Sequence, residues 1–460
     1  MKVRNQILSI LMNGILIGTL EKTKQSGLIF TYDKEWLNTP GARPVSLSLP
    51  LISQPFEGDV VYNFFDNLLP DNQQIRARIQ AKFKVKTDKP FDLLASIGRD
   101  CVGAIQIIEG ERPDFKKEIN FEPLNEKQIA SILRNYQVNP LGMADIDKDF
   151  RISIAGAQEK TAFLYYKNNW CRPLKDTPTT HIFKLPIGYI PQQQIDLSDS
   201  CENEWLCSQI ASGFGLPVAS CEILYYEDIK VLSVERFDRK LSSDGAWLMR
   251  LPQEDMCQAL GVSSNLKYQS DGGPGVKDIM ALLLSSSQPA RDRDIFYRSQ
   301  VLFWLLAGID GHAKNFSIFI EPEGKYRLAP LYDIMSAYPL IERKQLEAKK
   351  IKMAMALKGK NTHYHWYNMQ RRYFLETAKA IHYSEETAEV ILDEMLEQTD
   401  AVIEKVAAKL PTAFPSNISD PIFKGLSATS KKLRKQGCLF GLQQGSVVIK
   451  GDIISPIDED

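Results

Sequence analysis

The chain has few cysteines and histidines for its length, and this scarcity narrows the classes of protein it can belong to. Its 460 residues include seven cysteines, an odd number, and no two of them have the C-x-x-C spacing. We therefore expect reduced thiols in a cytoplasmic protein, and neither a disulfide framework nor a zinc site. The five histidines are mostly scattered, which also argues against a dedicated metal centre.

The chain also lacks an excess of either charge and a long apolar segment. With 56 basic and 57 acidic residues the net charge is −1, so any nucleic-acid binding would depend on a local patch. No apolar run reaches membrane-spanning length and the N-terminus has no signal-peptide pattern, so we expect no membrane partner. A hydrophobic content of 44% fits a globular protein, and the length suggests two or three domains.

The expected elements divide the chain into a strand-rich first half and a helix-rich second half. Asn13-Gly14, between two apolar runs, predicts a hairpin. Pro70 should interrupt a helical segment, with Asp71 capping its restart, and the polar stretch 111–128 should be a linker. We expect an α+β fold with a β-rich N-terminal lobe and an all-helical C-terminal lobe. The expected divisions are a β-rich subdomain (1–110), a nucleotide-binding part (111–240), a helical catalytic lobe (241–436) and a tail of unknown role (437–460).

A turn of small residues stands between two strand-like runs, RISI and TAFLYY. It consists of Ala155, Gly156, Ala157 and Gln158. Small residues let backbone N–H groups approach a phosphate closely. The turn is not a Walker A loop, which needs a second glycine, a lysine and a following helix. A tight hairpin without a ligand therefore remains an alternative.

Lys184 lies inside an expected apolar strand, THIFKLP. A lysine there is costly unless it is paired or reaches solvent, and it suits a cation that grips the α- and β-phosphates of a nucleotide. Glu202 and Glu204 fall in the first turn of the next expected helix, which Ser198 or Ser200 should cap, and either glutamate could pair with Lys184. An edge-strand lysine, with acids favoured only by the helix dipole, is the alternative.

Three hard-oxygen side chains follow in the stretch from Leu306 to Tyr338. Asp310 comes directly after an apolar run, Asn315 follows it by five residues, and Asp333 follows a predicted hairpin. Such groups hold Mg²⁺ and position a hydroxyl, although Asp and Asn are also common turn residues. Small-residue turn, strand lysine, helix glutamate, then Asp, Asn and Asp is the order of parts for phosphoryl transfer in protein kinases. A two-lobed, protein-kinase-like fold is therefore expected, although the His-Arg before the kinase aspartate and the Asp-Phe-Gly signature are missing.

Basic and aromatic residues interleave between Arg343 and Arg372. This segment is the best local candidate for contact with a phosphate backbone, and Arg371 and Arg372 at an expected helix start are the residues to test first. A solvated helix face or a basic loop would have the same composition.

The motifs, taken together and in order, resemble one family. NFFDNLLPD, FRISIAGAQEKTA, THIFKLP, VERFDR, SDGGPG, DGHAKNFS and PLYDIMSAYP are similar to the HipA family of serine/threonine kinase toxins from HipBA toxin–antitoxin modules. The resemblance covers roughly residues 5 to 435. It implies an ATP- and Mg²⁺-dependent protein kinase that acts on the translation machinery, with the aminoacyl-tRNA synthetase for glutamate as the family's best-known target.

The resemblance also assigns expected roles to single residues. Asp310 matches the catalytic aspartate, Asn315 and Asp333 match the Mg²⁺ ligands, and Ser153 matches the autophosphorylated serine. Phosphorylation beside the turn should repel ATP and inactivate the kinase. The residues implied in nucleotide binding are Ala155, Gly156, Ala157, Gln158, Glu159, Lys184, Glu235, Arg236, Phe237, His312, Lys314, Asn315, Tyr332 and Asp333.

The function implied is that of a type II toxin that causes growth arrest and persistence. A HipB-like helix-turn-helix antitoxin dimer would bind the chain and operator DNA, and the complex would repress its own operon. Two alternatives remain from the sequence: a catalytically weak, DNA-associated co-repressor, and a small-molecule kinase.

Overall fold

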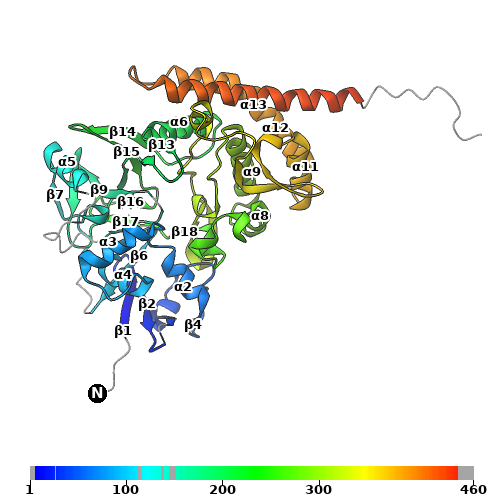
Figure 1. The fold of residues 1–460 in the computed structure, drawn as a ribbon. Helices are drawn as coiled ribbons and strands as arrows, with labels where there is room; N and C mark the ends of the chain where they lie inside the picture. Colours follow the sequence, from blue (N-terminus) through cyan, green and yellow to red (C-terminus); the bar gives the residue numbers. More distant parts are fainter. Residues whose placement is uncertain are drawn as a thin grey trace, which may run out of the picture.

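Residues 6–109 contain a five-stranded antiparallel sheet in the order β4-β3-β2-β1-β6 (Figure 1). The structure is a computed structural model, and it describes residues 6–25, 27–110, 115–135, 139–143, 152–156 and 158–443. Asn13 and Gly14 have φ of 50° and 78°, which confirms the predicted hairpin. The strands are β1 (Gln6–Met12), β2 (Ile15–Lys22), β3 (Leu28–Tyr32), β4 (Phe56–Glu57) and β6 (Ile105–Glu109).

Three helices pack against this sheet: α2 (Asp59–Asp66), α3 (Gln73–Phe83) and α4 (Pro90–Ile97). The break at Pro70 is confirmed, but the capping residue was predicted wrongly. Asn72 caps α3 by accepting a hydrogen bond from the backbone N–H of Gln74 at 2.8 Å. Asp71 turns away from the helix because two lysines from distant segments bind its carboxylate.

The second sheet has six strands in the order β14-β15-β11-β9-β10-β7. Its members are β7 (Phe121–Pro123), β9 (Lys160–Tyr166), β10 (Asn169–Pro173), β11 (His181–Lys184), β14 (Cys221–Tyr226) and β15 (Ile229–Glu235). The expected linker at 111–128 is partly wrong, because β7 pairs with β10 and α5 (Glu126–Arg134) packs on the same sheet. Helix α6 (Ser200–Gly213) has Asp199 as its N-cap residue, so the predicted serine cap is also wrong.

A short parallel pairing joins the two sheets' regions. Strand β5 (Asp100–Cys101) pairs with β8 (Ile152–Ser153). The hydrophobic core of the first hundred residues continues into Ile152, Ile154 and Ala162, so this region and the start of the second sheet share one core.

The remaining part is rich in helices, but the expectation of an all-helical lobe is wrong. A three-stranded sheet, β18-β19-β20, and a hairpin of β21 and β22 lie among the helices, because their apolar runs are β-rich and too short for helices. The strands are β18 (Gln253–Asp255), β19 (Ser317–Ile320), β20 (Tyr326–Leu328), β21 (Lys352–Lys358) and β22 (Thr362–His365). The helices are α7 (Met256–Ala259), α8 (Val276–Leu283), α9 (Pro289–Leu305), α10 (Tyr338–Glu342), α11 (Arg371–Ala380), α12 (Glu385–Ala407) and α13 (Ser416–Gln443).

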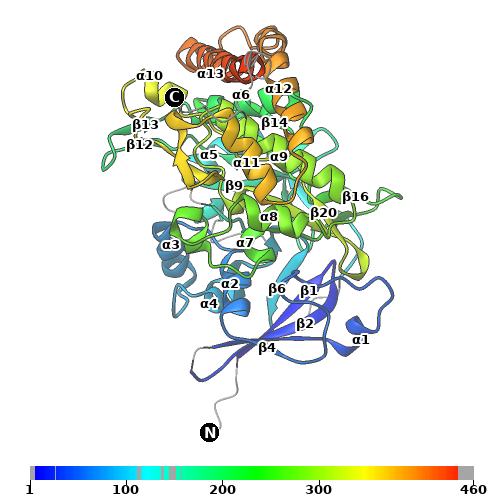
Figure 2. The ribbon, with the colours of Figure 1, turned by 90° about the vertical axis from the view of Figure 1, so that its right-hand side faces the viewer.

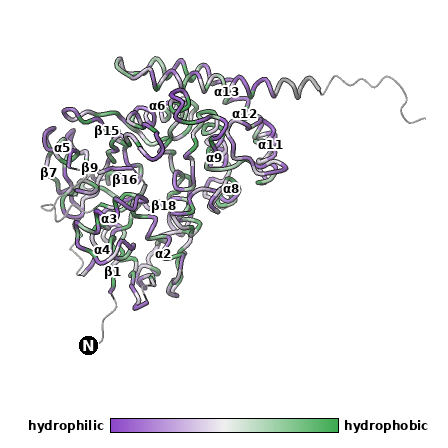
Figure 3. The backbone as a smooth tube through the Cα atoms, in the orientation of Figure 1, coloured by the Kyte–Doolittle hydropathy of each residue, from purple (hydrophilic) through white to green (hydrophobic). Residues whose placement is uncertain are grey.

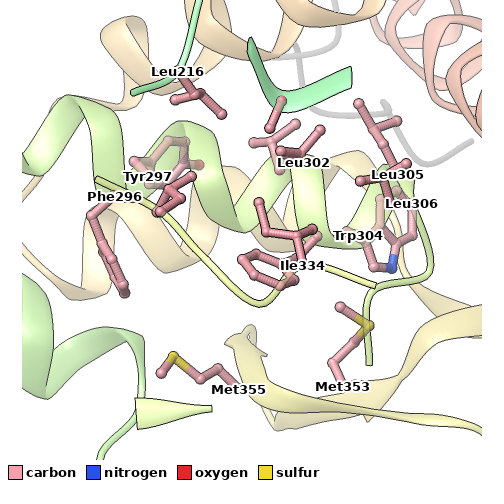
Figure 4. Close-up of a cluster of buried hydrophobic side chains, with 14 of the residues drawn as sticks. Leu216, Phe296, Tyr297, Leu302, Trp304, Leu305, Leu306, Ile334, Met353 and Met355 are labelled. Carbon is pink, nitrogen blue, oxygen red and sulfur yellow. The ribbon is translucent and has the colours of Figure 1, made fainter. Parts of the chain in front are cut away.

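The largest core surrounds α9. Figure 4 shows Ile334 among Leu302, Leu305 and Leu306, and all four side chains are buried. Since Ile334 directly follows Asp333 and α9 leads into Asp310, one core anchors the chain next to both carboxylates. Tight packing of this kind holds side chains in single conformations.

The regions follow one another in space (Figures 1 and 2). The five-stranded sheet lies at one end of the molecule and α12 and α13 at the other, in both views. Green and purple segments alternate along α13 in Figure 3. Among the described residues, no helix is long and apolar enough to cross a membrane.

Candidate active site

A cavity of about 720 Å³ gathers most of the predicted site residues. Its volume is in the range typical of small-molecule sites. The predicted residues that line it are Ala155, Gly156, Gln158, Glu159, Lys184, Glu235, Arg236, Phe237, Asp310, His312, Lys314, Asn315, Tyr332 and Asp333. Ala157 lies outside the described residues, as do residues 444–460 of the predicted tail.

Lys184 lies at the end of β11 and bridges two carboxylates. Its Nζ is 2.6 Å from Oε1 of Glu204 on α6 and 2.9 Å from Oδ1 of Asp333. This confirms that a glutamate of the α6 N-terminus pairs with Lys184; Glu202 instead pairs with Lys230. Burial opposes the charge on Lys184, but Asp333 and Glu204 outweigh it and raise the pKa of the ammonium group.

Asp333 is the partner of Lys184 that faces the cavity. Burial disfavours its ionised form, but the charges of Lys184 and Lys160 outweigh that effect and lower the pKa of Asp333 to about 2. The side chain of Asp333 is 36% exposed, against 5% for Glu204. Its backbone has a φ of 61°, a left-handed conformation that costs energy in a non-glycine residue and often marks a functional site.

The loop after α9 presents Asp310 to the same cavity. Its side chain is 48% exposed, and one carboxylate oxygen accepts a hydrogen bond from the hydroxyl of Tyr268. Nε2 of His312 is 4.0 Å from that oxygen. Burial lowers the pKa of His312, so the imidazole stays neutral at pH 7 beside Asp310.

Asn315, on a short 3₁₀ turn (Ala313–Asn315), joins the two acidic segments. Its Nδ2 donates to the backbone carbonyls of Asp310 at 3.1 Å and of Asp333 at 3.2 Å. Among the described hydrogen bonds none uses its Oδ1, and Asn315 and Asp333 both line the cavity. This donor set fits Mg²⁺, which favours one or two protein oxygens and completes its shell with water and phosphate.

The small-residue turn approaches the same end of the cavity. Gly156 has a φ of +107°, a conformation that other residues rarely adopt, and a Cβ there would lie 2.4 Å from Nζ of Lys160 and force that side chain to move. That Nζ donates to the carbonyl of Ala155 at 2.6 Å. Burial and the nearby Lys184 lower the pKa of Lys160 to about 8. Glu159 pairs with Arg78, and Gln158 donates to the carbonyl of Leu185.

The segment Glu235–Phe237 follows β15 at another edge of the cavity. The Arg236 side chain is buried between Asp100 and Asp238, so any contact it makes with a ligand must come from its backbone. Phe237 packs against Tyr332, with ring centroids 5.8 Å apart, which fixes the wall of the cavity near Asp333.

Ser153 does not line the cavity. It belongs to β8, is fully buried, and donates a hydrogen bond from Oγ to the carbonyl of Leu68 at 2.7 Å. The residue lies three positions before Gly156, so it is close in sequence to the turn but covered by the first sheet's region.

The two arginines predicted to contact nucleic acid differ in their exposure and in their partners. Arg371 is 4% exposed, and its guanidinium lies 2.6 Å from Asp393 and 3.2 Å from Glu389 on α12. The structure therefore corrects the prediction for Arg371, whose charge is already neutralised within the fold. Arg372 is exposed, and its guanidinium lies over the ring of Tyr373.

The predictions missed three residues: Asp71 and Lys267, which line the cavity, and Tyr268, whose hydroxyl binds Asp310. Asp71 ends the motif NFFDNLLPD, and Lys267 and Tyr268 lie just before SDGGPG, but no periodicity or spacing in the sequence brings these segments to Asp310. Asp71 did carry a signal, since it follows Pro70 in the NLLPD run, but the pattern was interpreted as a helix cap.

Comparison with known proteins agrees with this arrangement. A family model described as "HipA-like C-terminal domain" matches residues 152–403, and one described as "HipA N-terminal domain" matches residues 8–108. The protein Y4mE of Sinorhizobium fredii is 34% identical over 345 residues, covering 73% of this chain and 78% of its own. The serine/threonine-protein kinase toxin HipA of Shewanella oneidensis is 27% identical over 317 residues, 66% of this chain and 69% of its own.

A solved structure shares the fold. The complex of Shewanella oneidensis HipA, HipB and operator DNA contains a chain that superimposes with a TM-score of 0.79 at 21% identity, covering 96% of this chain and all of that one. The chain described here belongs to the HipA family, and it is a HipA-like serine/threonine protein kinase.

Proposed function

We propose that this chain is the toxin of a HipBA-type toxin–antitoxin pair and transfers the γ-phosphate of ATP to a serine of a protein target. The observation that carries the proposal is the convergence of Lys184, Asp310 and Asp333 on one cavity. The six-stranded sheet and the helix-rich part would act as the two lobes of a protein-kinase-like fold, with the nucleotide between them.

Each side of the cavity has a role in this proposal. Lys184, held by Glu204, supplies the cation for the α- and β-phosphates. The turn from Ala155 to Glu159 offers backbone N–H groups to the phosphates, with Gly156 allowing the close approach. The backbone of Glu235–Phe237 meets the adenine ring.

The acceptor side of the site would be built by the loop after α9. Asp310 aims the substrate hydroxyl and accepts its proton, and its half-exposed carboxylate is accessible to a protein substrate. The Asp333 carboxylate and Oδ1 of Asn315 would hold Mg²⁺, which neutralises charge on the transferring phosphoryl group. His312, Lys314 and Tyr332 line the same end of the cavity.

We also propose that autophosphorylation at Ser153 inactivates the kinase. Because Ser153 is buried and bonded to Leu68, its hydroxyl reaches ATP only if β8 leaves β5. A dianion on this strand could not return to a fully buried position without a cation, so modification should hold the segment out. A Ser153→Ala variant should keep its activity during prolonged incubation with ATP, whereas the wild-type chain should become phosphorylated and lose its activity.

The proposed partners are a HipB-like antitoxin dimer, operator DNA bound through the complex, and an aminoacyl-tRNA synthetase as the protein substrate. The complex solved for the Shewanella oneidensis protein supports the first two by analogy. A co-repressor role needs only the outer surface and is compatible with the exposed Arg372. Operator shifts that are equal with and without this chain would contradict that role.

The test of the proposed function compares phosphoproteomes after induction of the wild type, Asp310→Asn and Glu397→Gln. Glu397 is an exposed acid of α12 that does not line the cavity, so its variant controls for the loss of one carboxylate. We expect growth arrest and new phosphoserine sites with the wild type and Glu397→Gln, and neither with Asp310→Asn. Growth arrest without any new protein phosphorylation would indicate a small-molecule kinase instead.

A further inference from the structure

Asp71 belongs to the region matched by the N-terminal family model, yet its side chain points into the cavity of the kinase site. Its Oδ1 lies 2.8 Å from Nζ of Lys314, and its Oδ2 lies 3.0 Å from Nζ of Lys267. Its backbone N–H donates to the carbonyl of Gly156 at 3.0 Å. One residue thus contacts the phosphate turn, the loop of Asp310 and the segment before α8.

Neither lysine contacts Asp310 in the described ion pairs, but both belong to segments that hold it. Lys314 is four residues beyond it in the same loop and is 5% exposed. Lys267 precedes Tyr268, whose hydroxyl donates to the Asp310 carboxylate and whose ring lies edge-on to His312. The carbonyl of Lys267 also accepts a hydrogen bond from the backbone N–H of Ala313 at 3.2 Å. Asp71 therefore holds Asp310 from two sides, through Lys314 and through Lys267 with Tyr268.

We propose that Asp71 is a positioning residue of the kinase site, contributed by the N-terminal domain. It fixes the distance between the phosphate turn and Asp310: its carboxylate binds Lys314 of the Asp310 loop and Lys267 of the segment before α8, and its backbone N–H binds the Gly156 carbonyl. The N-terminal domain therefore contributes a residue that positions the catalytic loop. The inference rests on the proposed phosphoryl transfer at this cavity, and it concerns how Asp310 is aimed.

The same domain contains a comparable buried ion pair whose acid, Asp92, does not line the cavity. Asp92 accepts from Nζ of Lys22 at 2.8 Å, and its side chain is 8% exposed, compared with 13% for Asp71. If Asp71 were only a structural partner, Asp71→Asn and Asp92→Asn should have the same consequences for activity.

The first test measures kcat and the KM for ATP of the full-length chain, with kcat expressed per nucleotide-binding site from calorimetric titration with a non-hydrolysable ATP analogue. We expect Asp71→Asn to lower kcat about tenfold to a hundredfold, because small misplacements of a catalytic group have effects of that size. The KM for ATP should not rise, since Lys184 is untouched. Asp71→Glu should recover part of the loss, and Asp92→Asn should keep kcat within about twofold.

A double-mutant cycle tests the route through Lys267. In a Lys267→Met background, Asp71→Asn should cost clearly less than it does alone, because the two residues act through one contact. Additive losses would show that Asp71 does not act through Lys267, and would overturn that half of the proposal.

A second readout does not depend on turnover. Hydrogen exchange of peptides spanning 264–271 and 310–316 should speed up in Asp71→Asn and stay unchanged in Asp92→Asn. Unchanged exchange in both peptides, or equal kinetic losses in both variants, would overturn the proposal. If the wild type itself transferred no phosphate, the proposed function would fail, and the exchange measurement alone would decide whether Asp71 positions the loop.

Discussion

Two buried charge clusters of this chain have similar composition and opposite character. In one, Asp100 and Asp238 bind the guanidinium groups of Arg236, Arg239 and Arg250, and no side chain of the five is more than 7% exposed. In the other, Lys184 joins Glu204 to Asp333, and the Asp333 carboxylate is 36% exposed at the cavity. Arg236 and Asp238 of the first cluster also border the cavity, but their side chains are 1% and 4% exposed, whereas the second cluster keeps a partly exposed carboxylate.

The first cluster explains how the regions are held together. Asp100 of β5 also accepts from the backbone and hydroxyl of Thr179, and Arg236 also donates to the carbonyl of Cys101. Charged groups that are buried and bound to one another and to nearby backbone and hydroxyl groups offer little to a ligand. In this chain, the buried ion pair that marks the candidate site is the one with a charged group that keeps exposed surface at the cavity.

The largest effect on stability should come from breaking the first cluster. Asp100→Asn leaves three buried guanidinium groups with Asp238 as the remaining carboxylate of the cluster, and we expect a loss of about 3–5 kcal/mol in the free energy of unfolding. Denaturant titration measures it. The fraction that stays folded should keep its nucleotide affinity; a loss below about 1 kcal/mol would show that the cluster does not support the fold.

Neutralising the partly exposed acid of the second cluster should have the opposite effect, with little change in stability and a large loss of activity. Asp333→Asn removes the charge facing the cavity while Lys184 keeps Glu204, so stability should change by about 1 kcal/mol or less. Phosphoryl transfer should fall about 10²–10³-fold, because a preorganised charge at the site is lost. Steady-state kinetics and thermal unfolding on one preparation check both parts. If Asp333→Asn lost activity only because it unfolds, the proposed difference between a stabilising cluster and a catalytic cluster would be contradicted.

Another buried acid, Glu254, has no ion pair among the described residues and should respond to pH. Burial raises the pKa of Glu254 on β18 to about 8, and its Oε1 accepts from the backbone N–H of Leu47. The folded chain holds this proton more tightly than the unfolded chain does, so stability should decline as pH rises from about 4.5 to 8, by up to about 4 kcal/mol. Glu254→Gln should flatten that slope in unfolding measured across this pH range. An unchanged slope would mean that Glu254 ionises freely in the fold.

The smallest effects concern the two neighbouring arginines. Arg371→Gln removes a buried guanidinium whose partners are half exposed, so we expect a loss of about 1 kcal/mol in stability. Arg372→Gln should change stability by less than about 0.5 kcal/mol. If Arg372 contacts operator DNA, only its variant should weaken the operator shift of the antitoxin complex. A weakened operator shift with Arg371→Gln and an unchanged shift with Arg372→Gln would contradict the assignment of Arg372 as the DNA contact.

The sequence predicted those elements whose conformation depends on residues close together in the chain. The Asn13-Gly14 turn, the strand of Lys184 and the helix of Glu204 all follow from neighbours in sequence, and the ordered motifs indicated the family. The positions of Asp71 and Arg371 could not be predicted in this way. Asp71 meets Lys314 across 243 residues, and Arg371 pairs with α12 instead of facing solvent, so both depend on tertiary packing. The prediction of an all-helical lobe was wrong because short apolar runs fit strands as well as helices.

The most direct test of the central claim is transfer of labelled γ-phosphate from ATP by the purified full-length chain. The wild type and Glu397→Gln should label serine, on the chain itself or on an added aminoacyl-tRNA synthetase. Asp310→Asn should bind nucleotide normally and label about 10²–10⁴-fold more slowly, as expected when a catalytic acid–base group is lost. Equal labelling by Asp310→Asn and the wild type would contradict the account of this cavity as the site of phosphoryl transfer.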